Sequence, residues 1–234
     1  MKRSSLSKKP FEKIVEEQIN RWQIEQKKKY KSPIRPVITM SRLAGAGGSI
    51  IAQKLAESLS IDFFDSSIVT KIAENAKVSE QVIKTLDEQD RSIFDEWLQA
   101  LDDHHLWSYE YLDHLVKVVS AIGAHGYAII VGRGASFILP QEVCLRVLVI
   151  APLEKRVDSF AQQYEVSESE AKKQIVMADS ARRGFIRKYF STDMTDPMHY
   201  DLVINTKNLD FDVAVNIITE AFNSRQWYNY NLKR

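Results

Sequence analysis

The glycine-rich stretch at residues 45 to 49 is the part of the sequence best suited to chemistry. It follows the apolar run Val37 to Met40 and precedes a segment with helical spacing from Ser49 to about Leu59. A strand, a glycine loop and a helix in this order predict an anion site, because glycines let backbone N–H groups approach a phosphate and the helix dipole adds positive charge. The alternative is a tight turn that binds nothing. The predicted phosphate-binding residues are Gly45, Ala46, Gly47, Gly48, Ser49 and Ile50.

The loop departs from the phosphate-binding pattern G-x-x-x-x-G-K-[ST] in its charge. Gly47 takes the second glycine, and Ser49 takes the hydroxyl that would help to hold Mg²⁺. Arg42 stands where the first glycine belongs, and Gly48 stands where the lysine belongs. Phosphoryl transfer would therefore need a positive charge from elsewhere in the chain.

Arginines at two other places could supply charge. Gly132-Arg133-Gly134 follows the apolar run Tyr127 to Val131, and ligands of parallel sheets bind at the carboxyl ends of strands. Arg133 is thus placed to fork onto a phosphate, unless it is a surface arginine in a turn. A second group would usually be a solvated helix face, but beside a phosphate site it resembles a mobile basic lid. Its members are Arg156, Asp179, Arg182, Arg183, Arg187 and Lys188.

Strands alternating with helices predict an α/β fold with a parallel sheet flanked by helices. Besides the segments above, strands are expected at residues 62–64, 145–150 and 202–205, and helices at about 153–164, 167–188 and from Asp210. Ser167 with Glu170 indicates a capping box, and Ser79 a helix start. Residues 66 to 123 are helical almost throughout and predict an insert over one edge of the sheet. Residues 10–29 predict an amphipathic helix within an extension, residues 1–35, and residues 225–234 form a tail.

Composition narrows the partners and the compartment. The chain has 234 residues, of which 44% are hydrophobic and 27% charged, as in ordinary globular proteins. Residues 1–35 carry a charge of +7 and the rest −6, but glutamates interleave with the basic residues, so a solvated helix face is preferred to nucleic-acid binding. No apolar stretch is long enough to span a membrane, and the lone Cys144 fits a reducing compartment. We expect a cytoplasmic protein that contacts neither membrane nor nucleic acid.

Two further features favour structural interpretations. His104-His105 beside Asp102-Asp103 invites a metal site, but neighbouring side chains on a helix point apart. The aromatic residues of the insert are expected to form its core or an interface rather than a base-stacking surface; they are Trp97, Trp107, Tyr109 and Tyr111. The helix at residues 10–29 packs on the main domain or on a second subunit, and a homodimer through this helix or the aromatic insert stays open.

Five motifs in order resemble the bacterial cytidylate kinase-like family, a divergent branch of the nucleoside monophosphate kinases with the P-loop fold. They are Ser-Arg-x-x-Gly-x-Gly-Gly with Ile-Ala-x-x-Leu-Ala, then Phe-Phe-Asp, Val-Gly-Arg-Gly-Ala, Asp-x-x-Arg with Tyr-Phe, and Tyr-Asp-Leu-Val-Ile-Asn-Thr at residues 200–206. The resemblance covers residues 36 to about 222. It implies a three-layer P-loop kinase fold in a domain at residues 36–224, with an acceptor-binding insert at 66–123 and a lid at 156–190.

The resemblance also implies a reaction and its residues. The reaction is transfer of the γ-phosphate of ATP to CMP or dCMP with Mg²⁺. Arg42 becomes the candidate for the missing loop charge, and Arg133 and Lys71 would hold the acceptor phosphate. Arg156 and Arg182 would neutralise the migrating group. The positions that match the start of the acceptor region and the lid are Asp65, Ser66 and Asp179.

Several positions depart from the true cytidylate kinases. Ser67 replaces a glycine after Asp65-Ser66, Lys71 an arginine, and Val131 and Gly134 the aspartates on either side of Gly-Arg. Three alternatives stay open for this reason. They are a kinase for another small-molecule acceptor, a nucleotide-binding regulatory protein without transfer activity, and an interaction module whose N-terminal helix and aromatic insert bind a partner.

Overall fold

A five-stranded parallel sheet forms the centre of the computed structural model, which describes residues 10–27, 35–102, 110–225 and 227. Its strands are β1 (Val37–Arg42), β2 (Asp62–Phe64), β3 (Ala128–Val131), β4 (Cys144–Ile150) and β5 (Leu202–Asn205), in the order β2-β3-β1-β4-β5. β1 lies between β3 and β4, with Met40 opposite Val131 and Val147. Most residues of the three central strands are buried, as in sheets covered on both faces.

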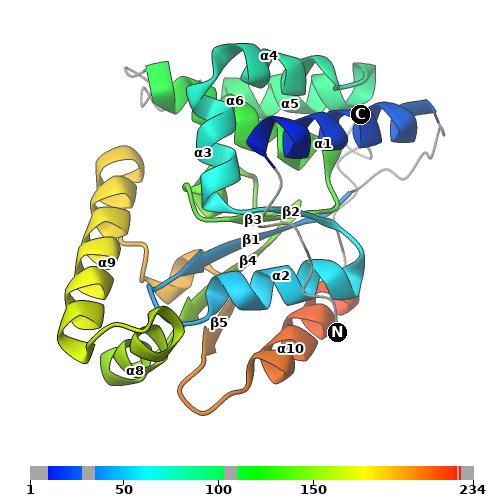
Figure 1. Ribbon diagram of the computed structural model, residues 1–234. Helices are drawn as coiled ribbons and strands as arrows, with labels where there is room; N and C mark the ends of the chain where they lie inside the picture. Colours follow the sequence, from blue (N-terminus) through cyan, green and yellow to red (C-terminus); the bar gives the residue numbers. More distant parts are fainter. Residues whose placement is uncertain (1–9, 28–34, 103–109, 226, 228–234) are drawn as a thin grey trace.

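Helices cover both faces, so the molecule has three layers (Figure 1). One layer holds α3 (Ser66–Glu74), α4 (Ala76–Lys84), α5 (Glu88–Asp102), α6 (Glu110–His125) and the short α7 (Ala135–Ile138). The opposite layer holds α2 (Gly48–Leu59) and α10 (Phe211–Ser224). The predicted α/β fold, with a parallel sheet flanked by helices, is confirmed.

The N-terminal helix α1 (Phe11–Lys27) packs against the layer that contains α3. Val15 and Trp22 are buried in the same hydrophobic cluster as α3, α6 and β3. The Trp22 ring stacks on His125 with 4.0 Å between centroids, and it also stacks on Phe64. Of the two expected positions for this helix, packing on the main domain is the one seen.

The region that the sequence predicts to be a lid forms a helical hairpin, which projects from the carboxyl end of β4 (Figure 1). It consists of α8 (Leu153–Tyr164) and α9 (Glu168–Phe190). Ser167 caps α9 by accepting a hydrogen bond from the Glu170 amide, as the capping box predicts. A small apolar cluster of Val157, Ala171 and Ile175 joins the two helices to Ala44 of the glycine loop.

The helical segment that begins at Ser66 packs at the β2 edge of the sheet, where α3 and α6 bury their apolar residues together with β2 and β3. Two other expectations about the elements were wrong in detail. Ser79 lies buried inside α4, whose cap is Asn75. Tyr127 precedes β3 with a φ of 47° and is exposed. His104, His105, Trp107 and Tyr109 lie outside the described residues, whereas Trp97 is buried as predicted. Cys144 is also buried.

Candidate functional site

The glycine loop joins β1 to α2 and leaves the start of that helix open. Gly47 is the N-cap of α2, with a φ of 82° that favours glycine, and it has no side chain to occupy the first free N–H groups of the helix. Thr206 fixes the loop by donating a hydrogen bond to the Ala46 carbonyl at 3.0 Å. The start of α2 therefore offers the donors that an anion needs.

Two of the loop glycines are also required by packing. A Cβ added to Gly47 would lie 2.3 Å from the ring of Phe211 in α10, and one added to Gly48 would lie 2.6 Å from the Cβ of Arg42. A side chain at position 48 thus competes with Arg42 for the same space. The missing lysine and the arginine six residues earlier are two parts of one local arrangement.

Arg42 ends β1 and extends from the loop toward the adjacent strand ends. Its Nη2 donates to the Ser66 hydroxyl at 3.0 Å, and a Cβ on Gly132 would lie 2.3 Å from its Nη1. Its Nε is buried without a hydrogen-bond partner among the described residues. The guanidinium therefore lies between the glycine loop and the start of α3.

The corner between β2 and α3 meets Arg133 as well as Arg42. Asp65 caps α3 by accepting hydrogen bonds from the amides of Ser67 and Ile68. The Ser66 carbonyl accepts a hydrogen bond of 3.2 Å from the Arg133 Nε. Arg133 lies between two glycines with a φ of 52°, a left-handed conformation that is uncommon outside glycine and recurs at functional sites.

Three arginines converge at this edge of the sheet. The Nη1 of Arg182 donates to the Arg42 carbonyl at 3.2 Å. Burial, and next the positive charges of Arg182 and Arg133, lower the pKa of Arg42 to about 10. Burial is also the main cause that lowers the pKa of Arg182, with Arg133 and Arg156 adding to it against Asp179. Clustered, partly buried cations of this kind favour an anionic ligand, since a phosphate would relieve their repulsion.

Arg156 and Asp179 form a buried pair beneath the loop rather than an open part of the lid. The Arg156 Nη1 lies 2.6 Å from the Asp179 carboxylate and 3.0 Å from the Ala44 carbonyl. The other Asp179 oxygen accepts a hydrogen bond from the Ala44 amide at 2.8 Å. Both side chains are over 90% buried. Together they attach α8 and α9 to the glycine loop.

Lys71 is turned toward α1. Its Nζ lies 5.5 Å from the centroid of the Phe11 ring, within the range of a cation–π contact.

The predicted site residues therefore divide into two sets. The loop, Arg42, Asp65, Ser66, Arg133 and Arg182 lie together at the carboxyl ends of the strands, while Arg156, Asp179 and Lys71 make contacts within the protein. Sequence reasoning missed Phe211 and Thr206 as loop supports, although the Ile-Asn-Thr motif contains the threonine.

Comparison with known proteins identifies the family of this chain. The model of the cytidylate kinase-like family matches residues 37–208. The chain belongs to this family. It is 23% identical to a cytidylate kinase of Staphylothermus marinus over 79% of this chain and 94% of that protein. It is 26% identical to a cytidylate kinase of Saccharolobus islandicus over 80% and 91% of the two chains.

A solved structure of an uncharacterized protein from Eubacterium ventriosum shares the fold. Its TM-score is 0.58 at 19% identity, covering 82% of this chain and all of the other. With the family membership and the parallel sheet, this establishes the three-layer P-loop kinase fold. α1 lies outside the residues that the family model matches.

The described residues include neither a membrane-spanning helix nor a side-chain cluster suited to a metal ion. None of their helices is both long and apolar enough to cross a membrane. They contain no group of three or more histidine, cysteine, aspartate or glutamate side chains arranged to hold a metal ion.

Proposed function

We propose that this protein is an ATP-dependent phosphotransferase that transfers the γ-phosphate of ATP to a nucleoside monophosphate, most specifically CMP or dCMP. The observation that carries the proposal is the position of three arginines beside the glycine loop. Arg42 contacts the corner at Ser66, Arg133 contacts the same corner, and Arg182 contacts the Arg42 carbonyl. The cytidylate kinases among the relatives support the choice of acceptor.

Different residues would bind the phosphates of ATP and the phosphate of the acceptor. The free amides at the start of α2 would bind the β- and γ-phosphates of ATP. Arg133, at the carboxyl end of β3, would bind the acceptor phosphate. Arg42 would span the gap, because its side chain starts beside Gly48 and ends beside Ser66. Arg42 would thus supply the charge that the loop lacks and place it between donor and acceptor.

The reaction asks the chain for charge and alignment more than for covalent help. A P–O bond forms between the acceptor phosphate and the γ-phosphorus, and the bond to the β-phosphate oxygen breaks to leave ADP. The acceptor phosphate is already an anion at neutral pH, so no general base is required. Arg42 and Arg182 would stabilise the negative charge on the equatorial oxygens during transfer.

Mg²⁺ fits the site as an ion held chiefly by the nucleotide and by water. Ser49 is exposed in the first turn of α2, where its hydroxyl would take one coordination position. Magnesium commonly keeps several waters and binds through substrate phosphates. When bound, the ion would neutralise phosphate charge near Ser49.

A coupled assay of ADP release tests this function directly. The purified chain would be given ATP and Mg²⁺ with, in turn, each nucleoside monophosphate and a panel of small alcohols. We expect turnover with CMP or dCMP above that with the other acceptors. Turnover only with an alcohol would show a kinase of another acceptor class, and ATP binding without any turnover would show a nucleotide-binding protein without transfer activity.

A further inference from the structure

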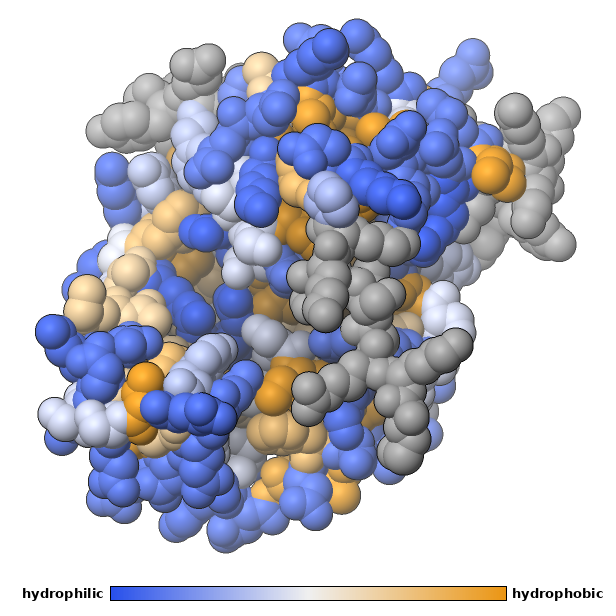
Figure 2. Space-filling model, viewed as in Figure 1, coloured by the Kyte–Doolittle hydropathy of each residue, from blue (hydrophilic) through white to orange (hydrophobic). Residues whose placement is uncertain are grey.

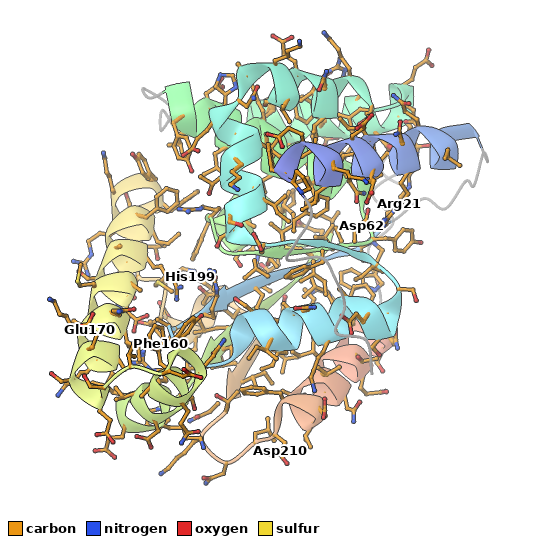
Figure 3. The ribbon with its side chains drawn as sticks, viewed as in Figure 1. Arg21, Asp62, Phe160, Glu170, His199 and Asp210 are labelled. Atoms are coloured by element: carbon orange, nitrogen blue, oxygen red, sulfur yellow. The ribbon has the colours of Figure 1, made fainter. Side chains whose placement is uncertain are left out.

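The N-terminal helix α1 contacts both elements that meet at the acceptor-side corner, Asp65-Ser66. On the β2 side, Asp62 accepts hydrogen bonds from Gln18 and Arg21, and the Arg21 Nη1 lies 2.5 Å from its carboxylate. Figure 3 shows Arg21 and Asp62 pointing toward one another between α1 and β2. On the α3 side, Phe11 lies under the Lys71 ammonium. The corner lies between these two attachments.

Burial indicates that the Asp62 contact is more than an exposed ion pair. The Asp62 side chain is only 11% exposed, although that of Arg21 is 55% exposed. A carboxylate buried to this extent needs its hydrogen-bond donors, because an unpaired buried charge is strongly unfavourable. Both of its side-chain donors named here come from α1. The position of β2 at the edge of the sheet is therefore tied to α1.

The hydrophobic contact between α1 and the corner is incompletely filled. A cavity beneath α1 is lined by side chains from α1, β2, α3 and α4, and its walls include Gln18, Trp22, Phe64 and Ile72. The polar contacts at Asp62 act beside this apolar contact, in which Val15 and Trp22 of α1 are buried. Loss of those contacts would let β2 and the start of α3 shift together.

We propose that α1 is a positioning element for the acceptor site, and that Asp62 with Gln18 and Arg21 are its positioning residues. The inference rests on the proposed function, since Ser66 matters here as the contact of Arg42 and Arg133. α1 holds β2 and α3 so that Ser66 presents its hydroxyl to Arg42 and its carbonyl to Arg133. It does not touch either substrate. The extension outside the family domain thereby affects acceptor binding.

The test compares Gln18→Ala/Arg21→Ala with two controls. Lys13→Ala/Glu16→Ala changes two exposed positions of the same helix, and Ile218→Val loosens the opposite layer, where Ile218 is fully buried. We expect the first variant to raise the KM for CMP by about three- to tenfold while the KM for ATP stays unchanged. Replacing Arg21 by lysine instead of alanine keeps the cation, so the KM for CMP should return most of the way to the wild-type value.

Hydrogen exchange provides a readout that does not depend on turnover. Amides of residues 62–72 should exchange faster in Gln18→Ala/Arg21→Ala than in either control, while those of residues 45–55 stay as in the wild type. Unchanged exchange at the corner, or KM values for both substrates that rise alike as in Ile218→Val, would overturn the inference. If the wild type turns over no monophosphate, the proposed function fails, and the exchange data still decide whether α1 holds the corner.

Discussion

Arg42 and Gly48 explain at the residue scale how this loop can lack its lysine. A side chain at position 48 would begin 2.6 Å from the Arg42 Cβ, so the chain accommodates one long cation at this place and not two. A lysine at position 48 would begin at the start of α2. The Arg42 side chain instead ends beside Ser66, on the proposed acceptor side of the loop. We interpret the pair as a relocation of the loop cation from the helix start to the end of β1.

The relocation predicts the behaviour of a swap. Arg42→Gly should lower kcat by about 10²-fold or more, the usual scale for loss of one preorganised charge contact. Gly48→Lys alone should not raise kcat, because the new side chain would clash with that of Arg42. The double variant Arg42→Gly/Gly48→Lys should recover part of the lost kcat. Steady-state kinetics check this, and a kcat in Arg42→Gly equal to that of the wild type would refute the role of Arg42.

Arg133 and Arg182 are predicted to act at different stages. Arg133 would bind the acceptor phosphate in the ground state and the transition state alike, so Arg133→Ala should raise the acceptor KM more than it lowers kcat. Arg182 would act chiefly on the migrating group, so Arg182→Ala should mainly lower kcat. Lysine should rescue neither fully, since it lacks the planar fork. Kinetics on one active acceptor distinguish the roles, and the same pattern in both variants would contradict them.

At the scale of elements, the base of the lid hairpin is fixed to the glycine loop. Asp179 on α9 and Arg156 on α8 both contact Ala44, so the carboxyl-terminal half of α9 cannot swing freely. The sequence placed both residues on lid helices but could not reveal a contact between positions 23 residues apart.

This attachment predicts a large effect on stability. Asp179→Ala should lower the free energy of unfolding by about 3 to 5 kcal/mol, because it leaves Arg156 as an uncompensated buried charge. The matched control is Asp113→Ala, which removes an exposed ion pair with Lys117 and should cost less than about 1 kcal/mol. Chemical denaturation measures both. Equal, small losses would show that the buried pair does not hold the hairpin to the loop.

A second group of buried charges links the extension to α5 and α6. Burial, and next the charge of Arg35, lower the pKa of His125 from its usual 6.5 to about 3. Burial raises the pKa of Asp90 from 3.8 to about 6. As the pH falls below 6.5, the unfolded chain takes up a proton at His125 first, which destabilises the fold. Between about 6 and 3.8 the folded chain takes one up at Asp90, which stabilises it.

The two titrations should therefore offset each other, and His125→Gln should uncover the second. The variant is expected to gain stability relative to the wild type as the pH falls from 6 to 4, by up to about 1.4 kcal/mol for each pH unit. Urea denaturation of both proteins across this range measures the difference. A difference that does not change with pH would mean that His125 is not held neutral in the fold.

At the scale of the whole molecule, hydrophobic periodicity was sufficient for the sheet and its flanking helices. It predicted all five strands because each is a short apolar run between turn signals. It could not predict that α3 and α6 cover a face of the sheet, since the order of strands is a tertiary property. The resemblance assigned Lys71 to the acceptor phosphate, and the contact of its ammonium with Phe11 could not be foreseen because it depends on where α1 packs. The glycine loop and the arginines after β1 and β3 could be predicted from the sequence, because the carboxyl ends of the strands in a parallel sheet share one edge.

The surface is consistent with this division between site and scaffold. Figure 2 shows a face covered largely by hydrophilic residues, with hydrophobic residues in separate patches. The arginines at the strand ends, Arg42, Arg133 and Arg182, are instead partly buried.

The most direct test of the account is a ³¹P NMR measurement of ATP, Mg²⁺ and CMP incubated with the protein, because it identifies the product as well as the consumption of ATP. We predict that the signals of ADP and CDP appear together and in equal amounts with the wild type, and that both are strongly reduced with Arg42→Gly. Release of inorganic phosphate without CDP, or no loss of ATP, would contradict the claim that the arginines align an acceptor phosphate with ATP.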